Sequence, residues 1–329
     1  VEYDRDSKYF YRSLKSINRK FGRTLLPYFI KLKRYSNFLI NDFEKYVLND
    51  WGRPDVIHAH VSMPAGFGAV CLGEKYNIPT AVTEHYSGFI NDAKYFWRLG
   101  LLHRYMLNRL SGFYCVSESF KANIETSLGY KVSGVIENPV DFSVFNLKES
   151  DSEPHGLMLV STGSVGALKG TDTILKATDY FDFEIDWSLR IYGDLSRLSN
   201  YASLIGTLKH ADRIEFCGSV EQDQLAKSYN ESDIYIVSSR KETANVSMFE
   251  AMACGCYVVS TRCGGPESLL PAEHSSLINV GDPEALGNVI NNYVKLMTNS
   301  SRQARSNYVR DKLSLQAIGN KMSELFSQF

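Results

Sequence analysis

The sequence has no excess of charge of one sign and no long apolar run. Its 36 basic and 37 acidic residues nearly cancel, so the chain as a whole is not expected to bind nucleic acid. Apolar residues make up 44% of the chain, yet none of their runs reaches the roughly 18–20 residues that cross a bilayer. We therefore expect a soluble cytoplasmic protein, at most peripheral on the inner face of the cytoplasmic membrane.

Paired cysteine spacings are also missing. The six cysteines lie mostly in apolar segments, at positions 71, 115, 217, 254, 256 and 263. This placement favours reduced thiols that pack as small core residues over disulfides. The group at 254, 256 and 263 lacks the fourth ligand and the Cys-x2-Cys spacing of a structural zinc site, so we expect no metal there.

Three further absences narrow the class of protein. The phosphate loop of the P-loop nucleotidases, Gly-x4-Gly-Lys followed by Ser or Thr, does not occur. No Asp-x-Asp follows an expected strand, because Asp4 and Asp6 lie in a separate amino-terminal stretch. We find no signal-peptide pattern and no internal repeat in the sequence, and therefore expect neither. We therefore expect a globular protein that does not depend on a metal.

The chain is long enough for two domains. At 329 residues it exceeds what one hydrophobic core usually carries. The segment from Glu149 to Pro154 is polar and rich in breakers, and a new apolar segment follows it. We therefore expect one domain at residues 1–150, a second at 151–312 and a terminal helix at 313–329.

Residues 8 to 34 carry the strongest local charge asymmetry. They include nine basic residues, no acidic residue and several aromatic ones. Arg12, Lys15, Arg19 and Arg23 recur near helical spacing, which is typical of an amphipathic helix. Such a helix can lie on an anionic membrane surface, but an ordinary solvated helix face has the same pattern. Nucleic-acid binding is a weaker third alternative.

The most informative motifs of the sequence lie in residues 238–270. An apolar strand ending at Val237 leads through a polar loop into a short helix from Val246, and a second apolar strand follows. Strand, helix and strand form a unit of a parallel sheet, whose ligands bind beyond the carboxyl ends of the strands. Glu242 and Glu250 are expected at that edge. They could accept hydrogen bonds from vicinal hydroxyls, act as acid and base, or merely lie at a helix terminus.

Two other segments are expected at the same kind of edge. The strand Leu157–Ser161 runs into a turn that contains Gly163 and Lys169, where backbone N–H groups and an ammonium could bind a diphosphate. In the first half, a strand ending at His60 and a strand ending at Thr83 deliver His60, Glu84, His85 and Tyr86 to one edge. For His58 we favour a core or structural role.

The motifs of the central stretch resemble a known family. Glu242 and Glu250, with Ala251-Met-Ala-Cys-Gly255 and Gly264-Gly-Pro-Glu267, resemble the nucleotide-binding signature of the family 4 retaining glycosyltransferases. The resemblance implies an α/β GT-B fold, with two Rossmann-like parallel-sheet domains facing each other across a cleft. It also implies that the terminal helix crosses back to the first domain, and that the first domain lacks its initial βα units in this amino-terminally truncated chain.

The resemblance also implies residue roles. Glu242 would contact hydroxyls of the donor sugar, Glu250 would hold the ribose, and His85 would bind the sugar near the reacting centre. The chain departs from the family after Glu242, where Thr243-Ala244-Asn245 stands in place of Gly and an apolar or aromatic residue. The resemblance therefore does not identify the donor sugar. Ser164 occupies the place of a diphosphate-binding Arg, for which Arg240 or Arg262 could compensate.

We therefore predict a metal-independent retaining glycosyltransferase that transfers a hexose-type sugar from a nucleoside-diphosphate sugar to a glycan or lipid-linked acceptor. The setting implied is bacterial surface polysaccharide or glycolipid assembly, and no cofactor is expected. A nucleotide-sugar epimerase of the same fold and a non-catalytic nucleotide-sugar binding fragment remain alternatives. The predicted catalytic residues are His85, Lys169 and Glu242; the donor-binding residues are Gly163, Ser164, Lys169, Gly218, Thr243, Ala244, Asn245, Val246 and Glu250; and the acceptor-side residues are His60, Glu84 and Tyr86.

Overall fold

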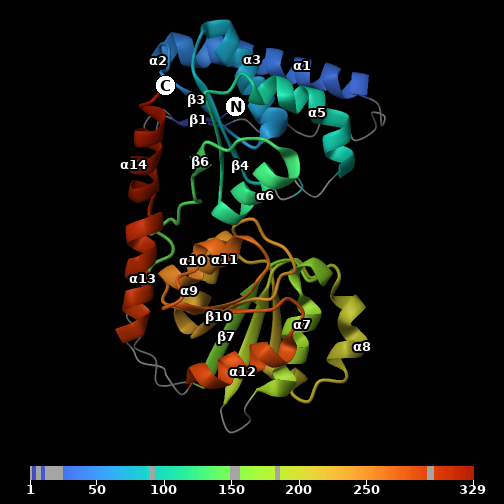
Figure 1. Ribbon diagram of the computed structural model, residues 1–329. Helices are drawn as coiled ribbons and strands as arrows, with labels where there is room; N and C mark the ends of the chain where they lie inside the picture. The colour runs from blue at the N-terminus through green and yellow to red at the C-terminus, as the bar shows by residue number, and fades with distance from the viewer. Residues whose placement is uncertain are drawn as a thin grey trace.

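The computed structural model describes residues 2–4, 9–11, 25–86, 88, 93–148, 156–181, 186–294 and 300–329. These residues form two α/β domains, each built on a parallel sheet, which lie one above the other in Figure 1. The predicted pair of parallel-sheet domains is thus confirmed. The expected boundary at residue 150 falls between the two sheets, in residues 149–155, which lie outside the described part.

The first domain has a four-stranded sheet in the order β3-β4-β5-β6. All its strand pairs are parallel, with Val82 beside Ala59 on one flank and Phe113 on the other. A short antiparallel pair, β1 with β2, is separate from this sheet. The elements are β1 Glu2–Asp4, β2 Tyr9–Tyr11, α1 Leu25–Asp42, α2 Asn49–Trp51, β3 Ile57–His60, α3 Phe67–Tyr76, β4 Thr80–Glu84, α5 Ala93–Leu107, β5 Gly112–Cys115, α6 Glu118–Leu128 and β6 Gly134–Val135.

The beginning of α3 differs from the prediction. The sequence predicts a helix from Met63 that enters through Pro64, but the α-helix begins only at Phe67. A π-helical segment at residues 62–66 precedes it, and Met63 within that segment has the extended dihedral angles φ −130° and ψ 129°. The residue before a proline is disfavoured in the helical region, so the chain is still extended at this point.

The second domain has a six-stranded parallel sheet in the order β12-β11-β10-β7-β8-β9. Side chains of β10 alternate between its faces: Ile234 and Ile236 pack with α7 and α12, and Tyr235 and Val237 with α9 and α10. The elements are β7 Leu157–Thr162, α7 Thr171–Ala177, β8 Trp187–Tyr192, α8 Ala202–Ile205, β9 Ile214–Gly218, α9 Gln222–Glu231, β10 Ile234–Val237, α10 Val246–Ala253, β11 Tyr257–Thr261, α11 Gly265–Leu269, β12 Ser275–Ile278, α12 Pro283–Val294, α13 Ser300–Leu313 and α14 Leu315–Phe326.

The last two helices run along one side of the molecule from the second domain to the first (Figure 1). In α13, the buried Arg305 donates through Nε to the carbonyl of Gly255 at 2.8 Å, next to the end of α10. In α14, Lys321 forms a 2.7 Å ion pair with Glu137, and Phe326 packs against aromatic rings of the first-domain sheet. The carboxy-terminal helices therefore connect the two domains.

The basic stretch falls partly outside the described residues. Residues 12–24, which include Arg12, Lys15, Arg19 and Arg23, are not described, and α1 begins at Leu25. Membrane-surface binding through this stretch stays a prediction. No helix within the described ranges is both long enough and apolar enough to cross a membrane.

A close backbone approach requires glycine at position 170. Gly170 precedes α7 with φ +66°, and a Cβ atom there would overlap the carbonyl oxygen of Ser238. Gly281 has a similar φ of +75°, but no atom lies within 4 Å of the corresponding Cβ position. The two glycines share the left-handed backbone and differ in the available space.

We predict that Gly170→Ala lowers the free energy of unfolding of the second domain by about 2–4 kcal/mol, because clash adds to backbone strain. The control Gly281→Ala should cost only about 1–2 kcal/mol, for the strain alone. Chemical denaturation of both variants measures the difference. Equal losses would mean that Ser238 does not approach Gly170 as described.

Candidate active site

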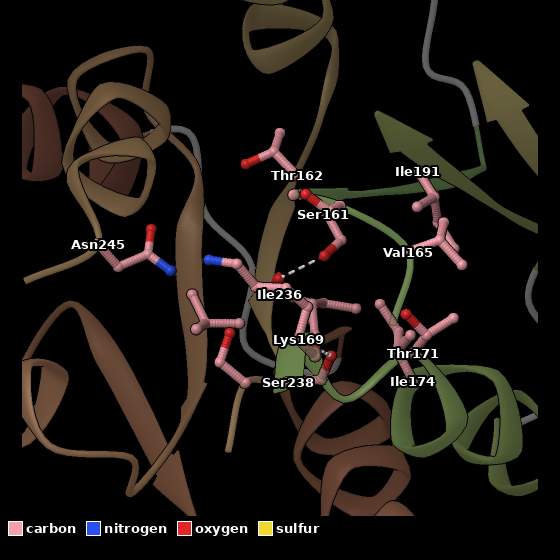
Figure 2. A pocket seen from close by; sticks show the side chains of 14 residues that line it. Ser161, Thr162, Val165, Lys169, Thr171, Ile174, Ile191, Ile236, Ser238 and Asn245 are labelled. Atoms are coloured by element: carbon pink, nitrogen blue, oxygen red, sulfur yellow. Dashed lines mark hydrogen bonds between the residues drawn. The ribbon is translucent and has the colours of Figure 1, made fainter. Parts of the chain in front are cut away.

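Two neighbouring cavities, which share four lining residues, lie at the carboxyl edge of the second sheet. A small cavity of about 20 Å³ lies between β7, β10 and the start of α7, and a larger one of about 240 Å³ opens beside it. Lys169 and Asn245 line both cavities, and their side chains face each other in Figure 2. The larger cavity is lined by Thr162, Gly163, Lys169, Tyr192, Gly193, Ser219, Val220, Leu225, Asn245 and Ser247.

The turn after β7 is built differently from the prediction. Its N–H groups at Gly163, Val165 and Gly166 already donate to Tyr192 O, Asp194 O and Thr171 Oγ1, each at 2.9 Å. These three amides therefore hold the turn together and are not available to an anion. The exposed Ser164 lies at the small cavity. Positive charge at this edge must come chiefly from Lys169.

Lys169 is paired with one of the two predicted glutamates. Its Nζ donates to Glu242 Oε1 at 2.6 Å. Ser239 Oγ donates to the same oxygen at 2.7 Å, and Asn245 Nδ2 at 3.5 Å. Among the described residues, no donor contacts the other oxygen, Oε2. Glu242 thus has one oxygen held by the protein and one left for a ligand hydroxyl.

Neither proposed replacement for the missing Arg reaches the cavities. Arg240 forms a two-pronged ion pair with Asp172 of α7, at 2.9 and 2.8 Å, and also donates to the carbonyl of Ala167. These bonds stabilise the turn between β7 and α7 on its exposed side. Arg262 is exposed at the end of β11, and neither residue is among those that line the two cavities. The ion pair with Asp172 gives no support to compensation by Arg240, which stays a hypothesis, as does compensation by Arg262.

Glu250 lies one turn inside α10, half-buried behind the larger cavity. Burial raises the pKa of its carboxyl to about 7, and a hydrogen bond with Ser247 opposes that rise. Ser247 itself lines the larger cavity. Nearby, the hydroxyls of Thr162 and Tyr235 hydrogen-bond at 2.6 Å. Thr162 and Ser247 thus bring hydroxyl groups to the lining of the larger cavity, and Glu250 lies next to Ser247.

The residues that follow Glu242 contact the other domain. Ser117 Oγ of the first domain donates to Thr243 O at 2.7 Å, and Thr243 Oγ1 donates to His85 O at 3.2 Å. Ala244 is buried in the apolar cluster of the first domain. The Thr243 and Ala244 side chains thus contact the first domain, and donor binding by these two residues stays a prediction.

Asn245 and Val246 form the entry to α10. Asn245 has φ +59°, a left-handed conformation that asparagine tolerates better than most residues, and its side chain lines both cavities. Val246 is the first residue of α10. Gly218 also shapes the edge, because its carbonyl accepts from Gly193 N at 2.9 Å and the chain then passes along the larger cavity.

A pair of histidines forms the first-domain side of the site. His60 Nδ1 and His85 Nε2 hydrogen-bond at 2.8 Å, and the Asn138 side chain hydrogen-bonds His85. Burial, together with the neighbouring His60, lowers the pKa of His85 to about 4, against the opposing hydrogen bond with Asn138, and burial also lowers the pKa of His60. Both imidazoles are therefore neutral near pH 7. Within the described residues, no group of three or more His, Cys, Asp or Glu could hold a metal.

Glu84 has a structural position that the sequence does not indicate. Its side chain is 1% exposed, and its oxygens accept from the backbone N–H groups of Ser62 at 2.9 Å, His85 at 3.0 Å and Tyr86 at 2.8 Å. Burial raises the pKa of Glu84, and these donors oppose the rise. Glu84 thus orders the loop that carries His85 instead of contacting an acceptor. Tyr86, by contrast, is 55% exposed.

Several site residues were not found by sequence reasoning. Ser117 is recognisable as the cap of α6, and Asn138 as part of a linker motif, but neither pattern indicates a contact across the site. Tyr192, Leu225 and Ser247 line the larger cavity from three different elements. Only the folded arrangement of the sheet brings these residues together, so no local signal could have found them.

Comparison with known proteins gives matches in both halves of the chain. A model described as glycosyltransferase family 4 matches residues 5–144, and one described as glycosyl transferases group 1 matches residues 156–295. An uncharacterised glycosyltransferase of Methanocaldococcus jannaschii is 28% identical over 72% of this chain and 64% of its own. A sulfoquinovosyl transferase of Arabidopsis thaliana is 22% identical over 70% and 48%. The chain thus spans less than two thirds of the length of these relatives.

The fold is also shared with solved structures. The Anabaena protein HepE, solved in complex with UDP, has a TM-score of 0.75 at 14% identity, covering 90% of this chain and 82% of that chain. At such low identity the likeness concerns the fold alone. With both halves matched by family models and the two-domain architecture shared, the chain belongs to the family 4, or group 1, glycosyltransferases and has the GT-B fold.

Proposed function

We propose that the chain transfers a hexose-type sugar from a nucleoside-diphosphate sugar to an acceptor hydroxyl, with retention of configuration and without a metal. One observation carries this proposal: Lys169, Glu242 and Asn245 meet at the two cavities, and the loop of Glu242 contacts the loop of His85. The cation and the carboxylate at the cavities, with the loop of His85 beside the loop of Glu242, support transfer between two substrates held next to each other.

The donor would bind mainly to the second domain. Lys169 would hold the diphosphate, the free oxygen of Glu242 would accept a sugar hydroxyl, and Glu250 with Ser247 would hold the ribose. The UDP complex of the structural neighbour from Anabaena supports a nucleotide-bound donor of this kind. The backbone beyond Gly218 lines the larger cavity and would receive the base.

Transfer with retention would proceed without an enzyme nucleophile. The acceptor oxygen would attack on the face from which the diphosphate leaves, so placement and charge stabilisation supply the catalysis. Lys169 would stabilise the leaving diphosphate, and this is the charge that a metal supplies in other enzymes. His85 would orient the sugar from the first domain, and His60 and Tyr86 lie on the acceptor side.

The acceptor would be a glycan or a lipid-linked glycan of bacterial surface polysaccharide or glycolipid assembly. This setting rests on the family resemblance. It would place the protein in the cytoplasm, with residues 8–34 available to bind an anionic membrane surface.

The first prediction concerns nucleotide binding. One of UDP, GDP, ADP and CDP should raise the melting temperature by several degrees, because ligand at about 100 times its Kd adds about 2.7 kcal/mol of stability. The shift should persist in EDTA. Thermal denaturation with each nucleotide measures it. A shift that EDTA abolishes would reject metal independence, and no shift with any nucleotide would reject the proposed donor class.

The second prediction concerns Glu250. The ionised carboxylate accepts both ribose hydroxyls better than the protonated carboxyl does, and the pKa of about 7 makes this form gain population across neutral pH. Nucleotide affinity should therefore rise from about pH 6 to pH 8. Glu250→Gln should weaken binding at about pH 8 by about 1.5–3 kcal/mol and remove that part of the rise.

Titration calorimetry at several pH values checks this prediction. The nucleotide's own phosphate titration is common to both proteins, so the difference between wild type and Glu250→Gln isolates the carboxyl. Parallel pH profiles with equal affinities would remove Glu250 from the site.

The third prediction concerns the product. When the donor is hydrolysed slowly without acceptor, a retaining enzyme releases first the sugar anomer that the donor carries. Proton NMR of the early reaction distinguishes the two anomers. Release of the opposite anomer would contradict retention, and conversion of the nucleotide sugar into its epimer would favour the epimerase alternative.

A further inference from the structure

A single ammonium group, that of Lys169, lies at this site and is already paired with a carboxylate. Lys169 is the one cation among the described residues that line the two cavities, and it is 2.6 Å from Glu242 Oε1. A diphosphate in the cavities would need the same ammonium. The carboxylate and the diphosphate therefore compete for Lys169, or share it.

Glu242 cannot follow the ammonium if it moves. Ser239 Oγ at 2.7 Å and Asn245 Nδ2 at 3.5 Å hold the same oxygen, and the backbone N–H of Glu242 donates to Cys263 O at 2.8 Å. The Glu242 side chain is only 13% exposed, against 34% for Lys169. Weakening the ion pair therefore leaves a poorly hydrated carboxylate, which is unfavourable unless new donors replace the ammonium.

We propose that the Lys169–Glu242 ion pair makes the site favour the intact sugar donor over the bare nucleoside diphosphate that remains after transfer. This inference rests on the proposed function. An intact donor supplies a diphosphate for Lys169 and sugar hydroxyls that donate to Glu242, so both charges are satisfied. The bare nucleoside diphosphate supplies only the first. It takes Lys169 from Glu242 without compensation, and its binding is weakened accordingly.

The ion pair thus discriminates between substrate and product, because only the binding of the product leaves the Glu242 carboxylate without a partner for its charge. Product release is favoured because the carboxylate recovers its cation when the diphosphate leaves. Glu242 acts here as a specificity-determining residue in addition to its contact with the sugar. The same reasoning does not apply to Arg240, whose guanidinium is paired with Asp172 on the outside of the turn.

The test uses Glu242→Gln, which keeps the shape and removes the charge. Titration calorimetry measures binding of the nucleoside diphosphate, taken from UDP, GDP, ADP and CDP, that stabilises the wild-type protein. We expect Glu242→Gln to bind it about three- to fivefold more tightly, the range for a partly exposed ion pair. Glu242→Ala serves as a second variant and should also bind more tightly.

Two controls separate this effect from a general change of charge. Glu273→Gln removes the same charge from an exposed position outside the cavity lining and should leave the affinity unchanged. In a Lys169→Met background, Glu242→Gln should give no further gain, because the competing ammonium is gone. A gain that persists without Lys169 would overturn the inference.

The outcomes also distinguish this inference from the proposed function. If wild-type protein binds a nucleoside diphosphate and Glu242→Gln binds it equally or more weakly, the competition is refuted and the donor site stands. If neither the wild-type protein nor Glu242→Gln binds any of the four nucleotides, the proposed function is refuted, and this inference with it.

Discussion

The loop that carries Glu242 depends on a close backbone approach that glycine alone permits. Glu242 pairs with Gly264 as a parallel bridge, and Gly265 N donates to Glu242 O at 2.9 Å. A Cβ atom on Gly264, where φ is +116°, would lie 2.6 Å from Glu242 O, and one on Gly265 would overlap Thr243 O. The Gly-Gly pair of the family signature therefore has a physical role: it lets one loop press against another and fixes the carboxylate at the edge of the sheet.

This fixed loop also sets the relation between the domains. Thr243, next to Glu242, accepts a hydrogen bond from Ser117 and donates one to the carbonyl of His85, so one residue contacts both loops of the first domain. The family pattern has glycine at this position, and glycine has no hydroxyl to make the second bond. Thr243, one of the residues at which the chain departs from the family pattern, thus connects the two domains through hydrogen bonds on either side of the site.

Local signals in the sequence were enough for much of the fold. A serine cap at Ser117 predicts a helix at Glu118–Leu128, and α6 has those bounds and that cap, because capping acts within a few residues. The burial of Glu84, the interdomain position of Ala244 and the pairing of Arg240 with Asp172 could not be predicted. Each depends on which loops meet after folding, and a carboxylate that binds three backbone amides has the same sequence signature as one that faces solvent.

The electrostatics of the two domains bear on where the acceptor proton goes in the proposed transfer. Charged groups come from the second domain, whereas the first contributes His58, His60 and His85, which are neutral near pH 7. A general base works best with a pKa near the working pH, and the pKa of about 4 makes His85 a poor proton acceptor. The leaving diphosphate, which gains negative charge as the bond breaks, is the stronger base at that point. The proton would therefore travel with the leaving group on the face of attack, and the neutral imidazole would orient the sugar without competing for the proton.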